Sequence, residues 1–576
     1  CYGMTLGKPR PTKWERVVVV SDYFEPTVER DSILGLHGCW LLPIGGQLPE
    51  GNVHLVASKI AGYDRAIYGI TGESHPILFE LKEYNIMLST SNLSNFVTGR
   101  YGPMPAWQGI WETLLEWLGE DKYSISWTPT VDVSYSKEDK LPSDVELKAI
   151  EKSYNWFKNH AVYSIASKKG VIEGYESAID YDGRQLPVIR ARGDCNAEAA
   201  MVFAYDWKLN ANPHSRHLAE EMLDNLWASP EFYNDDNASP VYGLSNWSEN
   251  NLLFYGDDNA RVLLATIVAA SLLEEDRWDE QILSCILANF RTGGKFGFRR
   301  NALRAEDLEK NGWKHYYDED FVIYAPHYQG FIWACYLWAY KKTGYEELLN
   351  RSKIGLEMMM RAYPKEWIWT NGISQEIAGM IFPLSYILQI EKDDRYVQWL
   401  DVMIDELWEQ MQPSGALHER LGPMENGKYP PPQSNDDYGT NEASLIQLNG
   451  DPASDLLYTV NWAFMGLHEA VMAVYDKTHV EMTDKFASFL CRIQVVSSEH
   501  PYLGGAWMRS FDDELWEYWG RSADFGWGAW CVESGWTNTW IFATLAAREL
   551  GTSIFALSME KDITVDYDSI IRYMLT

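Results

Sequence analysis

The stretch Tyr255-Gly-Asp-Asp-Asn-Ala-Arg261 opens directly into the apolar run 262–273. Apolar residues recur in that run with helical spacing, and Asp258 or Asn259 can cap the start of the helix. Carboxylates at a helix start are stabilised by free backbone N–H groups and by the positive end of the helix dipole, whether or not they take part in chemistry. Taken alone, the stretch therefore fits a capped core helix and a functional loop about equally well.

The same design, a polar and aromatic loop that leads into an apolar helix, recurs five more times. The other five loops are residues 190–198, 324–329, 367–376, 434–455 and 526–538. Together the six loops precede every second helix, whereas plainer turns lead into the helices between them. One such loop could be a helix cap, but six of them predict a shared site.

The part of the chain after residue 145 carries apolar residues at helical spacing in twelve segments. These segments are 147–163, 197–209, 216–227, 262–273, 278–289, 330–343, 345–362, 377–389, 395–411, 456–475, 481–495 and 539–550. Twelve helices with a polar loop before every second one predict a mainly α fold, an (α/α)6 toroid over residues 145–576. Its six inner helices point the same way, so their starts and the loops before them converge on one mouth.

Residues 1–121 follow a different pattern, which predicts a smaller α/β domain. Apolar strand segments occur at 17–20, 53–57, 66–70 and 86–89, and one helical pattern covers 106–118. Strands with few crossover helices indicate a parallel sheet that has lost its N-terminal part. A connector with prolines and a short charged run predicts a linker over residues 122–144.

Charge and composition exclude some classes of partner. The chain has 576 residues, of which 82 are acidic and 49 basic, and its formal net charge is −33. Such a surface repels nucleic acid, and no Lys/Arg-rich run offsets it, so we expect no nucleic-acid partner. No run of about 18 apolar residues occurs, so we expect no membrane-spanning segment. The 26 tryptophans and 34 tyrosines favour a carbohydrate ligand wherever they stand beside polar loops, because aromatic rings stack on sugars.

The seven cysteines indicate neither a metal site nor a disulfide framework. They are scattered, odd in number and without a CxxC pair, and Cys285, Cys335 and Cys491 fall in apolar helical runs. A site of mixed His, Asp and Asn ligands would have no local motif here. We therefore expect no metal and no cofactor.

Two family resemblances follow from these motifs. The phrase 93–101, followed by Trp107, Trp111 and Trp117, resembles the closing strand and helix of glutamine-amidotransferase-like domains. That resemblance brings no active site, because no cysteine stands at a nucleophile turn, and it implies a non-catalytic role for this part. Nearly the whole chain resembles bacterial six-hairpin (α/α)6 carbohydrate-active proteins, the superfamily of unsaturated glucuronyl hydrolases and several polysaccharide lyases. The motifs that carry this second resemblance are YGDDNAR (255–261), RTGGKFGFR (291–299), APHY (325–328), WTNG (369–372) with QE (375–376), and NGDP (449–452) with DLLYT (455–459).

The second resemblance implies an enzyme that acts on an oligosaccharide. Glycoside hydrolysis needs a carboxylic acid to protonate the leaving oxygen and a carboxylate to activate water or attack. Asp194 and Asp258 are the expected catalytic pair, because each begins an inner helix beside an arginine and the superfamily's hydrolases place a key Asp at such a loop. Crowded acids in a half-buried cleft raise one another's pKa, as a general acid requires. The expected substrate-binding residues are Arg192, Asp257, Arg261, His327, Trp369, Glu376, Asp437, Glu442, Glu533 and Trp536.

Each residue type has a second interpretation. Arginines such as Arg192 and Arg261 grip a carboxylate with two hydrogen bonds, which suits a uronate sugar, or they neutralise the carboxylate cluster itself. His327 offers substrate a hydrogen bond or a proton, or it is a core histidine. Trp369 and Trp536 are stacking platforms or core residues.

A glycoside hydrolase, with exo action on a uronate-containing glycan as a refinement, is the leading interpretation. A polysaccharide lyase would use His327 or a tyrosine as its base, and a third possibility is a non-catalytic glycan-binding or assembly protein. A sugar epimerase is less favoured, because related toroids use histidine pairs and only His327 lies in a mouth loop. A homo-oligomer stays open. The sequence leaves the compartment undecided between the bacterial cytoplasm and the periplasm. A mature lipoprotein would begin with an acylated cysteine, and Cys1 could be that residue, but a fragment or a tag explains this start equally well.

Overall fold

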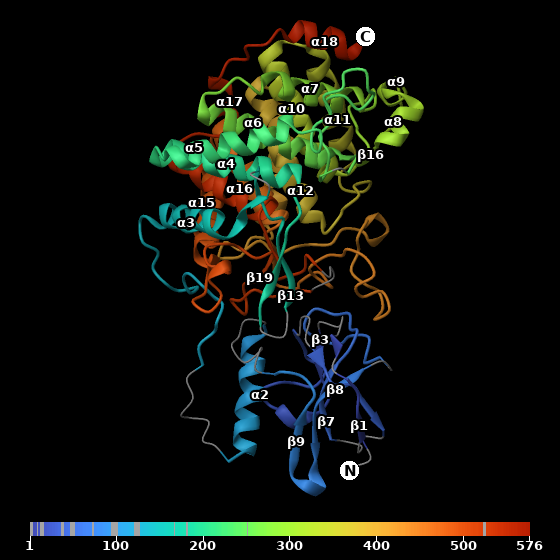
Figure 1. The fold of residues 1–576 in the computed structure, drawn as a ribbon, viewed down its shortest axis with the longest axis vertical. Coiled ribbons are helices and arrows are strands. Elements are labelled where there is room, and N and C mark those ends of the chain that lie inside the picture. The colour runs from blue at the N-terminus through green and yellow to red at the C-terminus, as the bar shows by residue number, and fades with distance from the viewer. Residues whose placement is uncertain are drawn as a thin grey trace.

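The computed structural model describes two parts of the chain, an N-terminal sheet domain and a larger helical part (Figure 1). The described residues are 4–8, 10–11, 16–35, 40–46, 52–71, 74–93, 102–119, 127–165, 168–179, 183–249, 251–521 and 526–576. The predicted (α/α)6 toroid is confirmed, and it occupies the helical part.

The toroid is built from six hairpins, each an outer helix followed by an inner one. The outer helices are α3 (Val145–Trp156), α5 (Pro213–Ala228), α7 (Asp279–Arg291), α11 (Glu346–Ala362), α13 (Asp394–Trp408) and α15 (Lys477–Ile493). The inner helices are α4 (Gly193–Asn210), α6 (Gly256–Leu273), α10 (Pro326–Thr343), α12 (Ile373–Ile390), α14 (Thr459–Ala473) and α16 (Trp536–Glu549).

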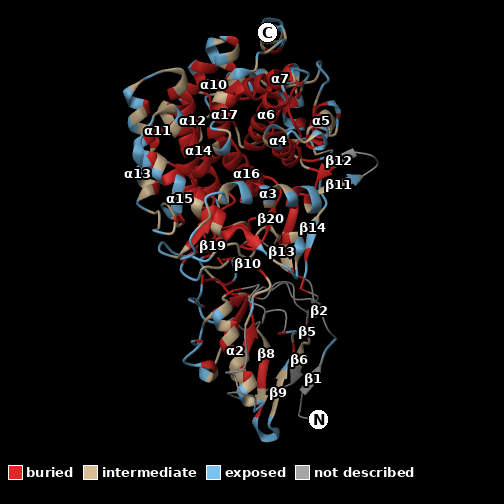
Figure 2. Ribbon diagram, turned by 90° about the vertical axis from the view of Figure 1, so that its left-hand side faces the viewer, coloured by how far each residue is buried: buried red, intermediate tan, exposed pale blue. Residues whose placement is uncertain are grey.

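The inner helices form a closed ring. Each contacts the next in the order α4, α6, α10, α12, α14 and α16, and α16 contacts α4 again. All of α6 is buried, and Figure 2 shows the inner helices as the buried layer of the toroid. Outer helices such as α15 bury one face only. A helix that is apolar on all sides needs neighbours on all sides, so the apolar composition of α6 and α12 places them inside and the amphipathic pattern of α13 and α15 places them outside.

The two ends of the toroid differ. Short turns join each inner helix to the next outer helix. Some inner helices end at a residue in the left-handed conformation, such as Ala211 after α4 or Gly344 after α10. Long segments with short strands lead into the inner helices at the other end. The strands there include β13 (Gly174–Ile179), β14 (Gln185–Val188), β15 (Leu253–Tyr255), β16 (Ala302–Arg304), β17 (Ala453–Asp455), β19 (Ser510–Asp512) and β20 (Val532–Glu533).

The N-terminal domain contains a five-stranded sheet in the order β4-β3-β7-β8-β9, packed with helix α2 (Met104–Trp117). Its strands are β4 (Ile33–Gly35), β3 (Arg16–Val19), β7 (Val53–Ala57), β8 (His75–Leu81) and β9 (Ile86–Ser89). Every pair in this sheet is antiparallel, so the expectation of a parallel sheet was wrong. Short connections without crossover helices are what antiparallel pairing requires.

The structure confirms the predicted helix of this domain but not all of its predicted strands. Residues 66–70 form a turn, exposed from residue 67 onward, and no strand, whereas the helix predicted at 106–118 is confirmed as α2. Most of the amidotransferase-like phrase 93–101 lies outside the described residues, and the domain boundaries stay a prediction. In the described part of the linker, β10 (Asp132–Val133) pairs with β18 (Val495–Val496) of the toroid.

We also compared the helices with the requirements of a membrane span. In the described part of the chain, no single helix is long and apolar enough. α16 and α17 (Ile554–Glu560), bent by 69° at their junction, meet the requirement as a pair, by length and composition only.

Candidate active site

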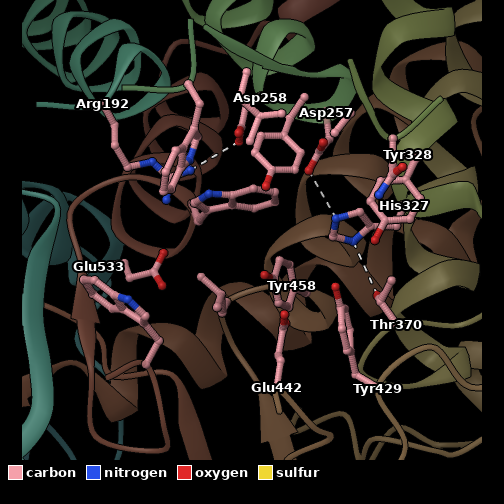
Figure 3. A pocket seen from close by; sticks show the side chains of 18 of the residues that line it. Arg192, Asp257, Asp258, His327, Tyr328, Thr370, Tyr429, Glu442, Tyr458 and Glu533 are labelled. Atoms are coloured by element: carbon pink, nitrogen blue, oxygen red, sulfur yellow. Dashed lines mark hydrogen bonds and ion pairs between the residues drawn. The ribbon is translucent and has the colours of Figure 1, made fainter. Parts of the chain in front are cut away.

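A cavity of about 600 Å³ opens where the inner helices begin (Figure 3). All six inner-helix starts contribute to its lining. Arg192 precedes α4, Asp257 and Asp258 lie in the first turn of α6, and His327 lies in that of α10. The remaining three starts contribute Thr370 before α12, Tyr458 before α14 and Trp536 at α16. The predicted convergence of the six loops is therefore present in the fold.

Seven of the twelve predicted site residues line this cavity and five do not. The lining residues are Arg192, Asp257, Asp258, His327, Glu442, Glu533 and Trp536. The five others are Asp194, Arg261, Trp369, Glu376 and Asp437.

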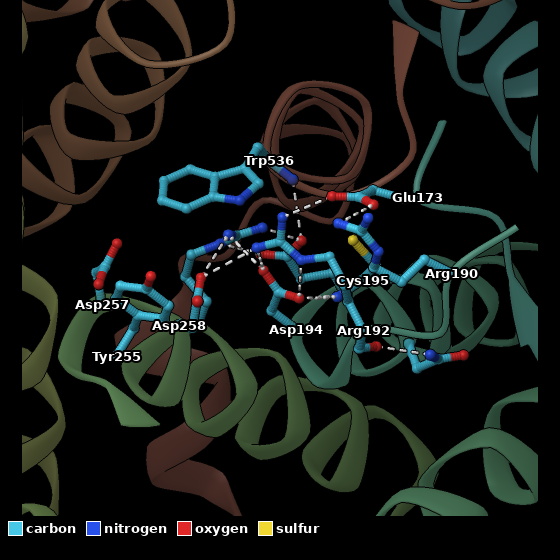
Figure 4. Close-up of polar contacts among 12 residues, drawn as sticks. Glu173, Arg190, Arg192, Asp194, Cys195, Tyr255, Asp257, Asp258 and Trp536 are labelled. Atoms are coloured by element: carbon cyan, nitrogen blue, oxygen red, sulfur yellow. Dashed lines mark hydrogen bonds and ion pairs between the residues drawn. The ribbon is translucent and has the colours of Figure 1, made fainter. Parts of the chain in front are cut away.

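Asp194 and Arg261 are buried behind the cavity lining in an ion network, and Figure 4 shows the contacts around Asp194. Arg192 donates two hydrogen bonds to Asp194, from Nε to Oδ1 at 3.0 Å and from Nη2 to Oδ2 at 2.6 Å. Arg261 donates to Asp194 Oδ2 at 2.7 Å and grips both oxygens of Glu198 at 2.6 Å. Against the desolvation that would raise it, these two guanidinium groups hold the pKa of Asp194 at about 2. Asp194 is therefore a fixed anion that positions two arginines and lies out of reach of substrate.

Asp258 is the unbalanced acid of the same network. Its Oδ1 accepts from Arg192 at 3.2 Å and from Arg261 at 3.5 Å, which are the longest contacts that either guanidinium makes to a carboxylate in the cluster. Both arginines are already paired with Asp194, Glu198 or Glu173. Burial, together with the charge of Asp194, raises the pKa of Asp258 well above its usual range. Asp258 thus faces the cavity with a carboxyl group that binds a proton more tightly than a free aspartate does.

The pKa of its neighbour Asp257 is shifted in the opposite direction. Burial acts to raise the pKa of Asp257, but the hydrogen bond with His327, 3.2 Å between Nε2 and Oδ2, and the charge of Arg261 outweigh burial and lower it. Among the described residues, Asp257 therefore keeps one buried carboxylate oxygen, Oδ1, without a hydrogen-bond partner.

The proton on His327 is placed by Gln375. The Gln375 Oε1 atom accepts from the backbone N–H of Asn371 at 3.3 Å, so its Nε2 is the atom that faces His327. That Nε2 donates to His327 Nδ1 at 2.5 Å. Because Nδ1 accepts, the ring proton lies on Nε2, which donates it to Asp257. Neither nitrogen of His327 is left free to act as a base.

Glu533 supplies a second protonated carboxyl group, from the strand β20 rather than from a helix start. Burial, opposed by Arg192 and helped by the charge of Glu173, raises the pKa of Glu533 to about 8. Its side chain points into the cavity across from Asp258 and Asp257 (Figure 3). Among the described residues, no group of three His, Cys, Asp or Glu side chains is arranged to hold a metal ion.

Aromatic rings form much of the remaining wall. The guanidinium of Arg261 lies 3.3 Å from the ring centroid of Trp536, and that ring also stacks at 6.0 Å on His327. Trp536 has a φ of 28°, an uncommon conformation for a tryptophan, and Glu198 accepts its backbone N–H at 3.0 Å. Strain of this kind gathers at functional sites. The other aromatic lining residues are Trp247, Tyr255, Tyr328, Tyr429, Tyr458 and Trp527.

The other three predicted residues support the fold around the cavity. Trp369 is fully buried and donates from Nε1 to the carbonyl of Pro423, so it is a core residue. Glu376 accepts from the backbone N–H groups of His327 and Thr370, and thereby joins two inner-helix starts. Asp437 is exposed and caps a turn through Ser434.

Sequence reasoning missed several lining residues. They are Glu173, Trp247, Asn301, Arg304, Lys428, Tyr429, Tyr458 and Arg509, besides Tyr255 and Tyr328 inside recognised motifs. Glu173 precedes β13 and Arg509 precedes β19, and neither lies at a helix start. Strand pairing rather than helical spacing brings them to the mouth, so no local signal marks them.

We compared the chain with known proteins. No family model and no curated protein matches it. Among solved structures it is similar to a D-mannose isomerase, at 12% identity and a TM-score of 0.48 over 71% of this chain and 100% of that one. It is also similar to an unsaturated glucuronyl hydrolase specific for heparin (10% identity, TM-score 0.44, 74% of this chain and 100% of that one). A cellobiose 2-epimerase from Spirochaeta thermophila has 12% identity and a TM-score of 0.48 over 70% of this chain and 96% of that one. Likenesses this distant transfer no activity to this chain.

Proposed function

We propose that this protein is a glycoside hydrolase that cleaves an oligosaccharide in the toroid cavity. The observation that carries the proposal is the pair of adjacent carboxyl groups, Asp257 and Asp258, whose pKa values are shifted in opposite directions. Acid–base catalysis of glycoside hydrolysis requires one carboxylic acid and one carboxylate. The aromatic walls and the volume of about 600 Å³ suit a sugar ring or two.

Asp258 is the proton donor in this mechanism and Asp257 is the base. Asp258 gives its proton to the glycosidic oxygen as the bond to the anomeric carbon breaks. Asp257 takes a proton from the water that attacks that carbon, so a hydroxyl group is added to one sugar and a hydrogen to the other. Arg192 and Arg261 stabilise the carboxylate that forms on Asp258, since both already lie within 3.5 Å of its Oδ1. Asp194, which the sequence predicted as the catalytic partner of Asp258, instead positions the guanidinium groups of Arg192 and Arg261.

Two observations favour hydrolysis over elimination or epimerisation. Both ring nitrogens of His327 are committed, one to Gln375 and one to Asp257, so this histidine has no lone pair for a substrate proton. Burial raises the pKa of the tyrosines in the cavity, to about 12 for Tyr429, so a tyrosinate base is unfavourable at neutral pH.

Basic residues support the finer proposal of a uronate-containing substrate. Arg192 and Arg261 are saturated by carboxylates of the protein, which is the second of the interpretations given above for them. Two basic residues of the cavity wall, Lys428 and Arg304, pair with no acidic group among the described residues, and the Nζ of Lys428 contacts the hydroxyl of Tyr328. Lys428 is therefore one candidate for binding a sugar carboxylate, as a single point charge.

The test is a turnover assay on a panel of neutral and uronate-terminated oligosaccharides, with three readouts. Hydrolysis produces new reducing ends without a new double bond. Elimination produces reducing ends with ultraviolet absorbance from a double bond conjugated to the carboxylate, and epimerisation changes the sugar composition without new reducing ends. If new reducing ends appear together with this absorbance, the protein is a lyase and the hydrolase proposal is wrong. Sugar binding without any turnover across the panel would replace it by a glycan-binding protein.

A further inference from the structure

The N-terminal domain lies at the end of the toroid where the cavity opens. Figures 1 and 2 place it next to β13 and β19, the strands that lead to the cavity lining. Among the described residues, however, none of the N-terminal domain lines the cavity itself. Any effect of this domain on the site must therefore pass through a segment of the toroid.

One segment of the toroid that reaches from this domain to the cavity is a long loop. Residues 428–445, which we name the pocket loop, supply Lys428, Tyr429 and Glu442 to the cavity. The loop contains neither a helix nor a strand. It is closed on itself by a 3.2 Å hydrogen bond from the backbone N–H of Ser444 to the carbonyl of Tyr429. Since the three lining residues lie near its two ends, the position of the loop sets their position.

Asn435 connects the middle of the pocket loop to the N-terminal domain. Its Oδ1 accepts the backbone N–H of Ala61 at 2.9 Å, and its Nδ2 donates to the carbonyl of Gly69 at 2.9 Å. The side chain is 8% exposed, so both hydrogen bonds are shielded from water. Lost partners would leave buried polar groups unsatisfied, which makes this contact costly to break.

Further contacts hold the same loop. Arg16 of the N-terminal strand β3 lies 5.1 Å from the ring centroid of Tyr438, and Arg521 of the toroid lies 5.3 Å from it. Tyr68 donates to the carbonyl of Pro432 at 3.5 Å, and Lys59 donates to the carbonyl of Asp436. The loop is therefore gripped by the N-terminal domain along residues 432–438.

The toroid holds both ends of the loop and also contacts Pro432. Lys428 donates its backbone N–H to the carbonyl of Trp369 at 2.8 Å, and Gln447 donates from Nε2 to the carbonyl of Pro432 at 2.9 Å. Arg521 donates its backbone N–H to the carbonyl of Leu445 at 2.8 Å and its guanidinium to that of Ser444 at 3.1 Å. A loop of this length without regular structure loses much conformational entropy when it is ordered. Contacts that order it in advance reduce what substrate binding must supply.

We propose that the N-terminal domain is a positioning element that pre-orders the pocket loop, and through it Lys428, Tyr429 and Glu442, for substrate. This inference rests on the proposed function for its kinetic consequence, though not for its structural one. It assigns a role to a domain that contributes no lining residue among those described. Asn435 is the residue through which that role is exerted.

The test compares Asn435→Ala with Tyr63→Phe in the full chain. Tyr63 donates to Asp512 Oδ2 at 2.8 Å across the same interface without touching the pocket loop, so Tyr63→Phe is the matched control. For Asn435→Ala we expect KM to rise about tenfold with kcat nearly unchanged, because binding must now order the loop. For Tyr63→Phe we expect an unchanged KM.

Hydrogen–deuterium exchange supplies a readout that needs no activity. Peptides that cover 428–445 should exchange faster in Asn435→Ala than in the wild type or in Tyr63→Phe, while peptides from α6 and α12 should not change. Unchanged exchange across 428–445 in Asn435→Ala would overturn the inference, even if a substrate is turned over. Faster exchange in an enzyme that cleaves no glycan would uphold it and reject the proposed hydrolase.

Discussion

Asp257 and Asp258 are consecutive residues at the start of one inner helix, yet the pKa of Asp257 is lowered and that of Asp258 is raised. The difference arises from what each side chain faces. Asp257 accepts a hydrogen bond from His327, whereas Asp258 meets two arginines that other carboxylates already neutralise. The local sequence does not distinguish the two residues. They differ because neighbouring helix starts bring different side chains next to each of them.

Asp194 tests the assignment of the buried network as a positioning device. Asp194→Asn removes one anion from beneath two guanidinium groups, and a buried ion pair that loses a partner costs about 3–5 kcal/mol. We expect urea unfolding to show a loss of that size. Asp437→Asn, on the exposed side of the pocket loop, is the control and should leave stability unchanged. Full stability with abolished turnover in Asp194→Asn would return Asp194 to the catalytic pair.

Glu533 predicts a pH dependence of stability. Burial raises its pKa from 4.5 to about 8 in the folded protein, so the folded state keeps a proton that the unfolded chain releases. The stability from this proton is fully present below pH 4.5 and is lost as pH rises through 8. Relative to Glu533→Gln, the wild type should therefore lose roughly 2–5 kcal/mol of unfolding free energy between about pH 5 and pH 8. Parallel profiles for the two proteins would mean that Glu533 is ionised throughout.

The proton on His327 can be observed directly. Nitrogen-15 NMR of labelled histidine should report an unprotonated Nδ1 and a protonated Nε2 for the resonance that His327→Gln removes. Gln375→Glu places an acceptor opposite Nδ1 and should move the proton there, with a loss of kcat/KM. A neutral His327 ring with its only proton on Nδ1 in the wild type would leave Asp257 without its hydrogen bond and contradict our assignment of the base.

Lys428 tests the uronate refinement. Lys428→Met keeps most of the side-chain volume and removes the charge, so kcat/KM should fall about ten- to a hundredfold for uronate-terminated substrates and little for neutral ones. Paired kinetics on the two substrate classes give the answer. An equal loss for both classes would show that Lys428 shapes the cavity without reading a carboxylate.

The toroid could be predicted because its information is local and repeated. The run 262–273 and its five counterparts are apolar on all sides, and that alone places α6 and its companions inside. The N-terminal sheet could not be predicted in the same way, since short apolar strands such as β3 and β7 carry no record of whether they pair parallel or antiparallel.

The candidate site was predictable where it lies at helix starts. Asp257, His327 and Trp536 each stand at such a start and line the cavity, whereas Glu173 and Arg509 reach it through pairs of strands that are distant in sequence, Gly174 with Glu533 and Ala453 with Asp512. Asp194 has the same local setting as Asp258. It differs in that Arg192 and Arg261 hold it more closely, at 2.6 and 2.7 Å against 3.2 and 3.5 Å for Asp258, which is a property of the packed ring.

The most direct test of the proposed chemistry is the turnover of Asp258→Asn measured beside its binding of the same oligosaccharide. An asparagine keeps the shape and cannot give a proton, so we predict a fall in kcat of about a hundred- to ten-thousandfold with a nearly unchanged dissociation constant. Turnover that stays within a few-fold of the wild type would contradict Asp258 as the proton donor.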